Sequence, residues 1–173
     1  SAISLGSGTS SGATGTFSGI ISGGANMAVI HNGSATSSIQ ALTGLNTYTG
    51  PTILSGTGAV LQANSLANGG TASSIGASSS AASNLVFNGG TLLYQGANAT
   101  VYQTTQTPSV SIDRLFTLAA SGTIQSSGTY GSPQIGTTTA NSAALIFNNT
   151  GDIAFAGTGT RLLTLGGTSI GDN

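Results

Sequence analysis

Helical periodicity is missing along the whole sequence, and this restricts the possible fold more than any other feature. No window of about 11 to 18 residues keeps apolar residues at a period of 3.6 without an interrupting glycine. Apolar and β-branched residues occur instead in runs of strand length, each bounded by turn-forming residues such as Gly and Asn. The sequence therefore predicts an all-β fold.

Alternation of apolar and polar residues is clearest in the run NLVFNGGTLLYQG, residues 84–96. Asn88-Gly89-Gly90 tolerates the positive φ angles of a tight turn between its two halves. A related pattern recurs in FNNTGDIAFAGTG, residues 147–159. The side chains expected to point into the core are Phe17, Leu85, Phe87, Leu92, Phe116, Phe147, Ile153 and Phe155.

The near absence of charge excludes several functions. Only 3% of the 173 residues are charged, lysine and glutamate are absent, and the net charge is -1. No basic patch is available for nucleic acid or an anionic membrane, and no apolar run approaches the roughly 18 residues of a membrane helix. The 28 glycines resemble linker composition, but the 38% of hydrophobic residues fall in patterned runs, so we expect a folded chain.

A β-solenoid explains why charge is so scarce. Successive rungs of such a coil pair about 4.8 Å apart, and stacked Thr or Asn avoids the repulsion of stacked Lys or Glu at this spacing. About 20 to 25 residues per rung would give roughly seven or eight rungs over residues 1–173. The Ser-, Thr- and Ala-rich segments 67–83 and 128–142 are poor strands and are expected to project as loops.

Two further expectations concern the ends of the coil. Exposed end rungs would pair with other strands, so we expect neighbouring sequence or neighbouring subunits to cover them, and the chain to be one segment of a longer secreted protein. The start, ISLGSGTSSG (3–12), is similar to the end, LTLGGTSIGDN (163–173). A tandem repeat unit that begins its first rung again would explain this similarity.

The run LTGLNTYTGPTILSGTGAVLQA, which begins at Leu42, resembles the passenger-associated repeat of autotransporters, the proteins of type V secretion. The motif matches at Leu42, Gly44, Asn46, Thr47, Tyr48, Thr49 and Gly50. Pro51 stands where a second glycine is commoner, and the preceding VIHNGSATSSIQAL lacks the lysine usual in the family. The lysine-free surface leaves open a fibre in which chains pack side by side.

The resemblance implies a right-handed parallel β-helix that is exported to the bacterial cell surface or secreted, serving as adhesin, stalk or matrix component. Turn chemistry accounts for the motif without a ligand. Asn46 suits a left-handed turn, Tyr48 can lie along the stack with its hydroxyl in water, and Gly50 permits the next bend. We therefore expect Asn46, Thr47, Tyr48, Thr49 and Gly50 to have structural roles.

No catalytic, metal or cofactor site is expected. His31 is the only histidine and is read as a turn residue, since metal sites need several convergent ligands. Asp113, Asp152 and Asp172 are the only carboxylate side chains. Asp113 reads as a local polar pair with Arg114, and Asp152 as a turn residue, although β-helices can host polysaccharide-cleaving carboxylate pairs.

The sequence thus predicts a non-catalytic structural protein, a β-helical segment of a bacterial surface fibre or matrix that associates with itself or with neighbouring repeats end to end. The alternative is an adhesin whose loops 67–83 and 128–142 contact a glycan or a host protein. A polysaccharide-cleaving enzyme is a third possibility. An ice-binding face would need Thr-x-Thr at regular intervals, which the sequence lacks.

Overall fold

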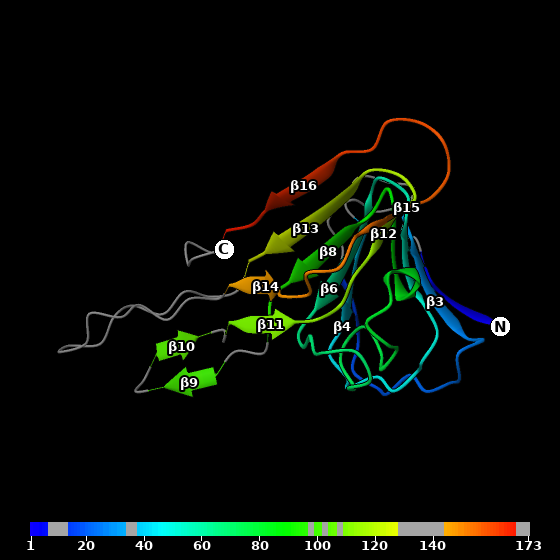
Figure 1. Ribbon diagram of the computed structural model, residues 1–173. Helices are drawn as coiled ribbons and strands as arrows, with labels where there is room; N and C mark the ends of the chain where they lie inside the picture. The colour runs from blue at the N-terminus through cyan, green and yellow to red at the C-terminus, as the bar shows by residue number, and fades with distance from the viewer. Residues whose placement is uncertain are drawn as a thin grey trace.

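The computed structural model describes residues 1–6, 14–33, 38–96, 99–101, 104–106, 109–127 and 144–168. Regular structure in these ranges is β-strand apart from one turn of 3-10 helix, η1 (Ala82–Asn84) (Figure 1). No helix within them has the length and apolar character to cross a membrane. The predicted all-β class is confirmed.

Two parallel sheets, each of six strands in the described part, carry the fold. The first sheet contains, in spatial order, β1 (Ala2–Leu5), β3 (Ala28–Asn32), β5 (Thr52–Ser55), β7 (Leu85–Asn88), β12 (Thr117–Leu118) and β15 (Ala154–Phe155). The second contains β2 (Thr14–Phe17), β4 (Ser38–Leu42), β6 (Ala59–Ala63), β8 (Thr91–Tyr94), β13 (Gly122–Ser126) and β16 (Leu163–Gly166). Each strand pairs only with the equivalent strands of the turns before and after it.

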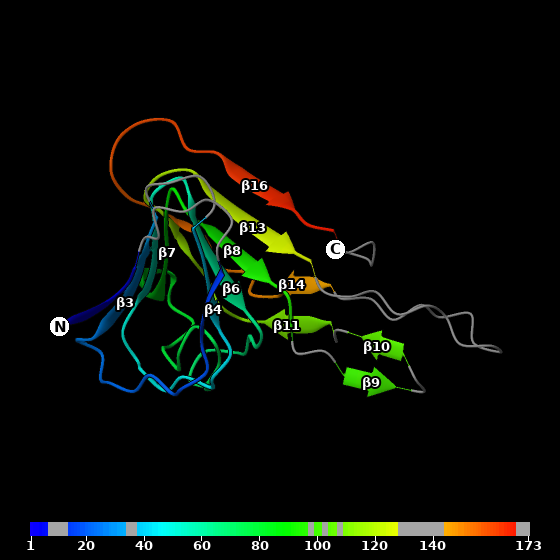
Figure 2. The ribbon, with the colours of Figure 1, turned by 180° about the vertical axis from the view of Figure 1, so that it is seen from behind.

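The chain runs from a first-sheet strand to a second-sheet strand and then returns, which makes a parallel β-helix as predicted (Figures 1 and 2). We number the turns as rungs 1 to 6 by their first-sheet strands. Paired residues of adjacent rungs lie 26 positions apart at Ala2 and Ala28 and 37 apart at Thr117 and Ala154. The described part therefore has six rungs rather than seven or eight, because the return segments are longer than predicted.

The return side is regular only in part. Rungs 4 and 5 contribute the parallel pair β11 (Val110–Ile112) and β14 (Leu145–Phe147). An antiparallel hairpin of β9 (Ala99–Val101) and β10 (Thr104–Gln106) extends away from the two large sheets (Figure 1). Rungs 2 and 3 return through the irregular segments 43–51 and 64–84.

One predicted loop does not project. Segment 67–83 lies on the return side with Ser73, Ser74, Ile75 and Ser78 buried. Its polar side chains bond to neighbouring rungs, so a sequence that is a poor strand still packs tightly. The other predicted loop, 128–142, lies outside the described residues.

The core is built from side chains stacked in register along the coil. On the first sheet one inward column consists of Leu5, His31, Leu54, Phe87, Leu118 and Phe155. On the second sheet a facing column consists of Gly15, Gln40, Leu61, Leu92, Ile124 and Leu165. Stacking of this kind follows from parallel pairing, which places equivalent faces above one another.

The residues expected in the core lie at different depths. Leu85, Phe87, Leu92 and Phe116 are buried, and Phe147 and Ile153 are partly buried against them. The rings of Phe87 and Phe116 meet edge to face with centroids 5.5 Å apart. Phe17 and Phe155 differ from the expectation, since they are 43% and 62% exposed. Their register is inward, but among the described residues rungs 1 and 6 have a paired rung on one side only.

The corner between the two sheets depends on glycine. Gly56 has a φ of +87°, and a Cβ atom there would lie 2.1 Å from the carbonyl oxygen of Gly33 in the rung before. Gly89, in the predicted Asn-Gly-Gly turn, occupies the equivalent corner of the next rung with a φ of +104°. The amide of Gly56 donates to the carbonyl of Asn88, which ties the corners together along the axis.

The two terminal segments of similar sequence lie on different sheets. Ile3 and Leu5 belong to β1 of the first sheet, whereas Leu163 and Leu165 belong to β16 of the second. The similarity therefore does not mark equivalent positions in the coil.

Candidate functional site

The NTYTG motif lies on the return side of rung 2, where its residues alternate between inside and outside. Asn46, Tyr48 and Gly50 are buried, and Thr47 and Thr49 are exposed. The amides of Thr47 and Thr49 donate to the carbonyls of Ile21 and Gly23 in rung 1. The motif therefore makes strand-like hydrogen bonds to rung 1. Three of its five residues face the interior of the coil.

Asn46 connects three rungs through its side chain. Its Oδ1 accepts from the amide of Ile21 at 2.8 Å, and its Nδ2 donates to the carbonyl of Ser74 at 2.9 Å. Its backbone exchanges hydrogen bonds with Ser73. Asn46 is thus a buried bridge between rungs 1, 2 and 3 rather than the left-handed turn residue suggested by the sequence.

Tyr48 is completely buried. The sequence suggested that its hydroxyl would lie in water, but the hydroxyl is inside the coil. The hydroxyl lies 2.7 Å from Thr52 Oγ1, which donates in turn to the carbonyl of Ile75 at 3.2 Å. Burial raises the pKa of Tyr48 to about 12, and the Thr52 hydrogen bond and the nearby Arg114 charge only partly oppose this. The phenol is a neutral structural group at physiological pH.

Gly50 is required by close approach of the chains rather than by a bend. A Cβ atom at this position would lie 1.9 Å from the carbonyl oxygen of Met27 in the rung below. Any other residue would push the two rungs apart, so the last position of the motif sets their separation.

Alkaline pH should test the Tyr48 environment. The unfolded phenol ionises near pH 10 and the folded one near 12, so the folded state holds the extra proton between these values. The contribution of Tyr48 to the free energy of unfolding is therefore fully present below pH 10. The free energy of unfolding should fall by about 2 to 3 kcal/mol as the pH rises toward 12. Urea unfolding measured from pH 9 to 11.5 checks this.

Tyr48→Phe is the matched variant for this titration. Burial also raises the pKa of Tyr94, so the variant should lose only part of the alkaline dependence. An unchanged pH profile in Tyr48→Phe would contradict the assigned environment.

Arg114 holds the return segment of rung 3 from the rung above. It is only 1% exposed. Its Nε donates to the carbonyl of Ala67, its Nη1 to Ser78 Oγ and its Nη2 to the carbonyl of Gly76, each at 2.9 Å. Burial lowers the pKa of the guanidinium, opposed by the nearby Tyr48 and Asp113. Through these three hydrogen bonds the buried guanidinium holds segment 67–83 against the coil.

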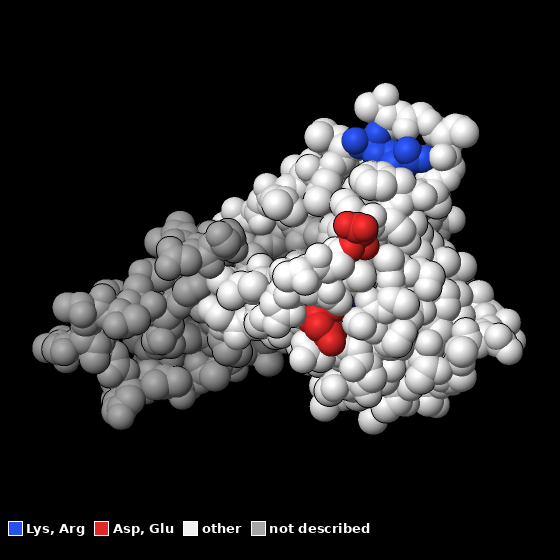
Figure 3. Space-filling model, viewed as in Figure 1, with Lys and Arg blue, Asp and Glu red and all other residues white. Residues whose placement is uncertain are grey.

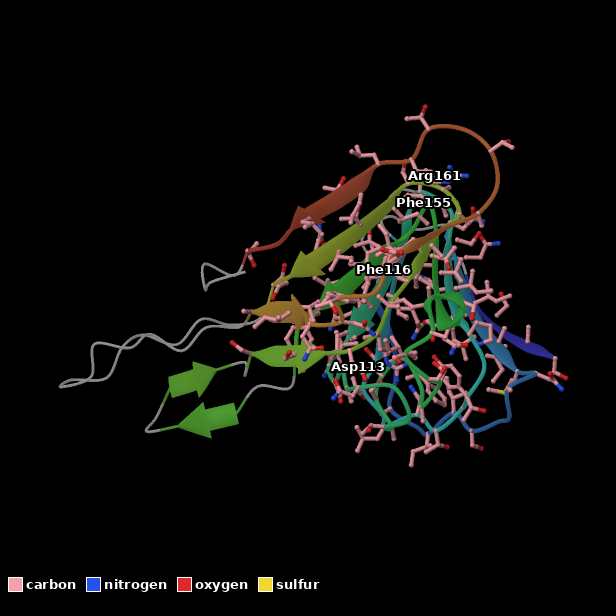
Figure 4. All side chains as sticks on the ribbon, in the orientation of Figure 1. Asp113, Phe116, Phe155 and Arg161 are labelled. Carbon is pink, nitrogen blue, oxygen red and sulfur yellow. The ribbon has the colours of Figure 1, made fainter. Side chains whose placement is uncertain are left out.

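Asp113 binds the same segment through different atoms. Its Oδ1 accepts from the amide of Gly69 at 2.7 Å, and its own amide donates to Asn68 Oδ1. From the rung above, Asn149 Nδ2 donates to the carbonyl of Asp113 at 2.7 Å. Asp113, labelled in Figure 4, and Arg114 are therefore two anchors on segment 67–83 rather than only the local polar pair expected from the sequence.

These contacts form one continuous structure, which we call the polar spine: Asn46, Ser74, Asp113, Arg114 and Asn149. Ser74 completes it, because its Oγ donates to the carbonyl of Leu42 at 2.7 Å and accepts from the amide of Ser65. On the return side, the polar spine supplies the hydrogen bonds between rungs that a third parallel sheet would otherwise supply. Sequence reasoning missed Ser74, and it paired Arg114 with Asp113 without predicting its contacts to segment 67–83. An arginine in a nearly charge-free chain was the available signal of such a role.

The residues considered for catalysis do not come together. His31 is buried in β3 rather than in a turn, with its Nε2 2.9 Å from the carbonyl of Ser38. Asp113 is engaged by Gly69, Asp152 is exposed before β15, and Asp172 lies outside the described residues. The described ranges contain no group of three or more His, Cys, Asp or Glu side chains that could hold a metal ion.

The two ends of the coil are hollow and apolar. A hollow of about 470 Å³ below rung 1 is bordered by Ile3, Leu5, Phe17 and Ile21. One of about 600 Å³ at rung 6 is bordered by Phe116, Ile124, Leu145, Phe147, Leu163 and Leu165. Leu165 is 72% exposed although it is in register with buried Leu92. Both ends thus present inward columns with no rung against them in the described part.

Comparison with known proteins supports the resemblance found in the sequence. Over 99% of its length the chain is 38% identical to the adhesin BmaC autotransporter of Brucella suis biovar 1 (strain 1330). The chain spans only about 4% of the length of that protein. No family model and no solved structure matches the chain. The similarity confirms the predicted autotransporter passenger origin and supports an extracellular, cell-surface location.

Proposed function

We propose that this autotransporter passenger segment is a non-catalytic structural stretch of β-helix in a bacterial surface fibre. The observation that carries the proposal is the polar spine, in which buried and partly buried polar side chains join rungs. Asn46 and Arg114 direct their hydrogen-bonding groups to neighbouring rungs. These two side chains thereby hold neighbouring rungs together.

The apolar ends support a place within a longer stack. Phe155 and Leu165 continue inward columns that are buried one rung earlier at Leu118 and Ile124. Burying each such side chain fully is worth roughly 1.5 to 3 kcal/mol. A further rung from flanking sequence or from a second chain would gain this energy and pair the open strand edges. We propose that the segment stacks end to end with such neighbours.

A second candidate function is adhesion, favoured by the hairpin β9–β10 and by the adhesin name of the relative. The hairpin extends from the sheets (Figure 2), whereas segment 67–83 is packed against neighbouring rungs. An adhesin would therefore bind a glycan or a host protein through the hairpin side of the coil.

One experiment separates the two functions. The purified segment is imaged by electron microscopy and tested for saturable binding to host cells, beside a variant in which residues 99–106 are replaced by a Gly-Ser segment of equal length. A structural segment should give rods that associate end to end, and the variant should behave in the same way. Discrete monomers whose saturable binding is lost in a correctly folded variant would overturn the structural proposal in favour of adhesion.

A further inference from the structure

The chain offers very few bonds to a protease that recognises basic residues. Trypsin-like serine proteases cleave after Lys or Arg, whose charge binds an aspartate in the specificity pocket. The full sequence contains no lysine and two arginines, Arg114 and Arg161. These two side chains lie in opposite environments, and this difference decides which bond can be reached.

Arg161 lies in the exposed loop between β15 and β16, at the rung 6 end of the coil (Figure 4). Figure 3 shows basic and acidic atoms only in small patches on an otherwise uncharged described surface. The loop turns at Gly157 and Gly159, which have φ angles of +75° and +107°. Leu162, on the other side of the peptide bond, is 64% exposed. Exposed loops of small and polar residues are the usual sites of proteolytic nicking.

Arg114 is protected by contrast. A protease would have to withdraw its buried guanidinium from Ala67, Gly76 and Ser78. The following amide, that of Leu115, donates to the carbonyl of Ser80 at 2.9 Å. Cleavage at Arg114 therefore requires the polar spine to open.

We propose that the Arg161–Leu162 peptide bond is the one site at which an extracellular serine protease specific for basic residues cuts the folded segment. The reaction is hydrolysis: the C–N bond between Arg161 and Leu162 breaks, and water supplies a hydroxyl to the new carboxyl group and a hydrogen to the new amino group. The proposal goes beyond a structural role, because it makes this loop a processing site in an otherwise resistant stretch of fibre.

The loop contains contacts that slow this cut. The Arg161 guanidinium donates to the carbonyls of Ala156 and Gly159 in its own loop. The amide of Leu162 donates to Ser121 Oγ at 3.0 Å, and its carbonyl accepts from the amide of Gly122. Because a protease binds an extended segment on both sides of the bond, these contacts must release first. Ser121 is exposed, so its hydroxyl can be removed without opening the core.

Limited digestion with trypsin tests the proposal, with products identified by mass spectrometry. Under native conditions we expect two products, 1–161 and 162–173, from a single cut. In urea that unfolds the substrate but leaves trypsin active, both arginine bonds should be cut at similar rates. Arg161→Gln should remove the native cut, and Ser121→Ala should accelerate it several-fold, with circular dichroism checking that both variants fold.

The outcomes that overturn the proposal are distinct. Native cleavage at Arg114 as fast as at Arg161 would show that burial of Arg114 does not protect it. No native cut at Arg161, on a timescale on which the unfolded chain is cut at both sites, would show that the loop is not a processing site. The digestion uses the monomeric segment, because end-to-end stacking would place a further rung against this end of the coil.

Discussion

Arg114→Met should lower the free energy of unfolding by about 3 to 5 kcal/mol. The variant keeps an apolar stem of similar length but leaves Ala67, Gly76 and Ser78 without their donor in a buried site. Each unsatisfied buried polar group costs about 1 to 3 kcal/mol, and relief of guanidinium desolvation returns part of the total. Urea unfolding followed by circular dichroism measures the loss.

Arg161→Met is the matched control, since it removes the other arginine of the chain from an exposed loop. Its cost should be below about 1 kcal/mol, as is usual for surface substitutions. Equal losses for the two variants would contradict the assignment of Arg114 as the anchor of segment 67–83. We expect Arg114→Met to destabilise the return side of rung 3 more than rungs 1 and 2. Hydrogen exchange in this variant should therefore be faster mainly in segment 67–83.

Phe87→Ala should also lower the free energy of unfolding by about 3 to 5 kcal/mol. Phe87 has no exposed surface, its ring meets Phe116 edge to face, and Gly122 lies directly against it. The rigid backbone of three paired rungs allows little collapse around the missing ring, so the cavity persists. Chemical denaturation gives the value.

Phe155→Ala is the control for this substitution because Phe155 belongs to the same inward column as Phe87. With 62% of its surface exposed in the described chain, it should cost less than about 1 kcal/mol. A loss at Phe155 as large as that at Phe87 would mean that rung 6 is covered in solution. The comparison therefore reports on end-to-end stacking as well as on the core.

Local patterns in the sequence were sufficient for the class of fold and for its strands. Alternation placed Leu85, Phe87 and Leu92 on inward faces, and the Asn-Gly-Gly turn between them is present. Such features depend on neighbours within a few residues, which the sequence displays directly. The sequence also singled out the NTYTG motif for structural roles, but Asn46 and Tyr48 make different contacts from those predicted.

Several of the predictions that failed concern contacts between residues far apart in the sequence. Asn46 bonds to Ser74, 28 positions later, and Arg114 bonds to Ala67, 47 positions earlier. Both separations are longer than the predicted rung of about 20 to 25 residues. They are longer because the return segments differ in size from rung to rung. The burial of segment 67–83 and of the Tyr48 hydroxyl therefore could not be inferred from composition.

By itself the sequence determined that this protein is a charge-poor, all-β coil, because strand periodicity and glycine-rich turns are local properties that leave few other folds open. Only the tertiary structure decided which polar residues are buried, which aromatic rings lie at open ends, and which of the two arginines a protease can reach. Burial and hydrogen bonding between rungs depend on the register of the coil, and that register is set by the lengths of the return segments.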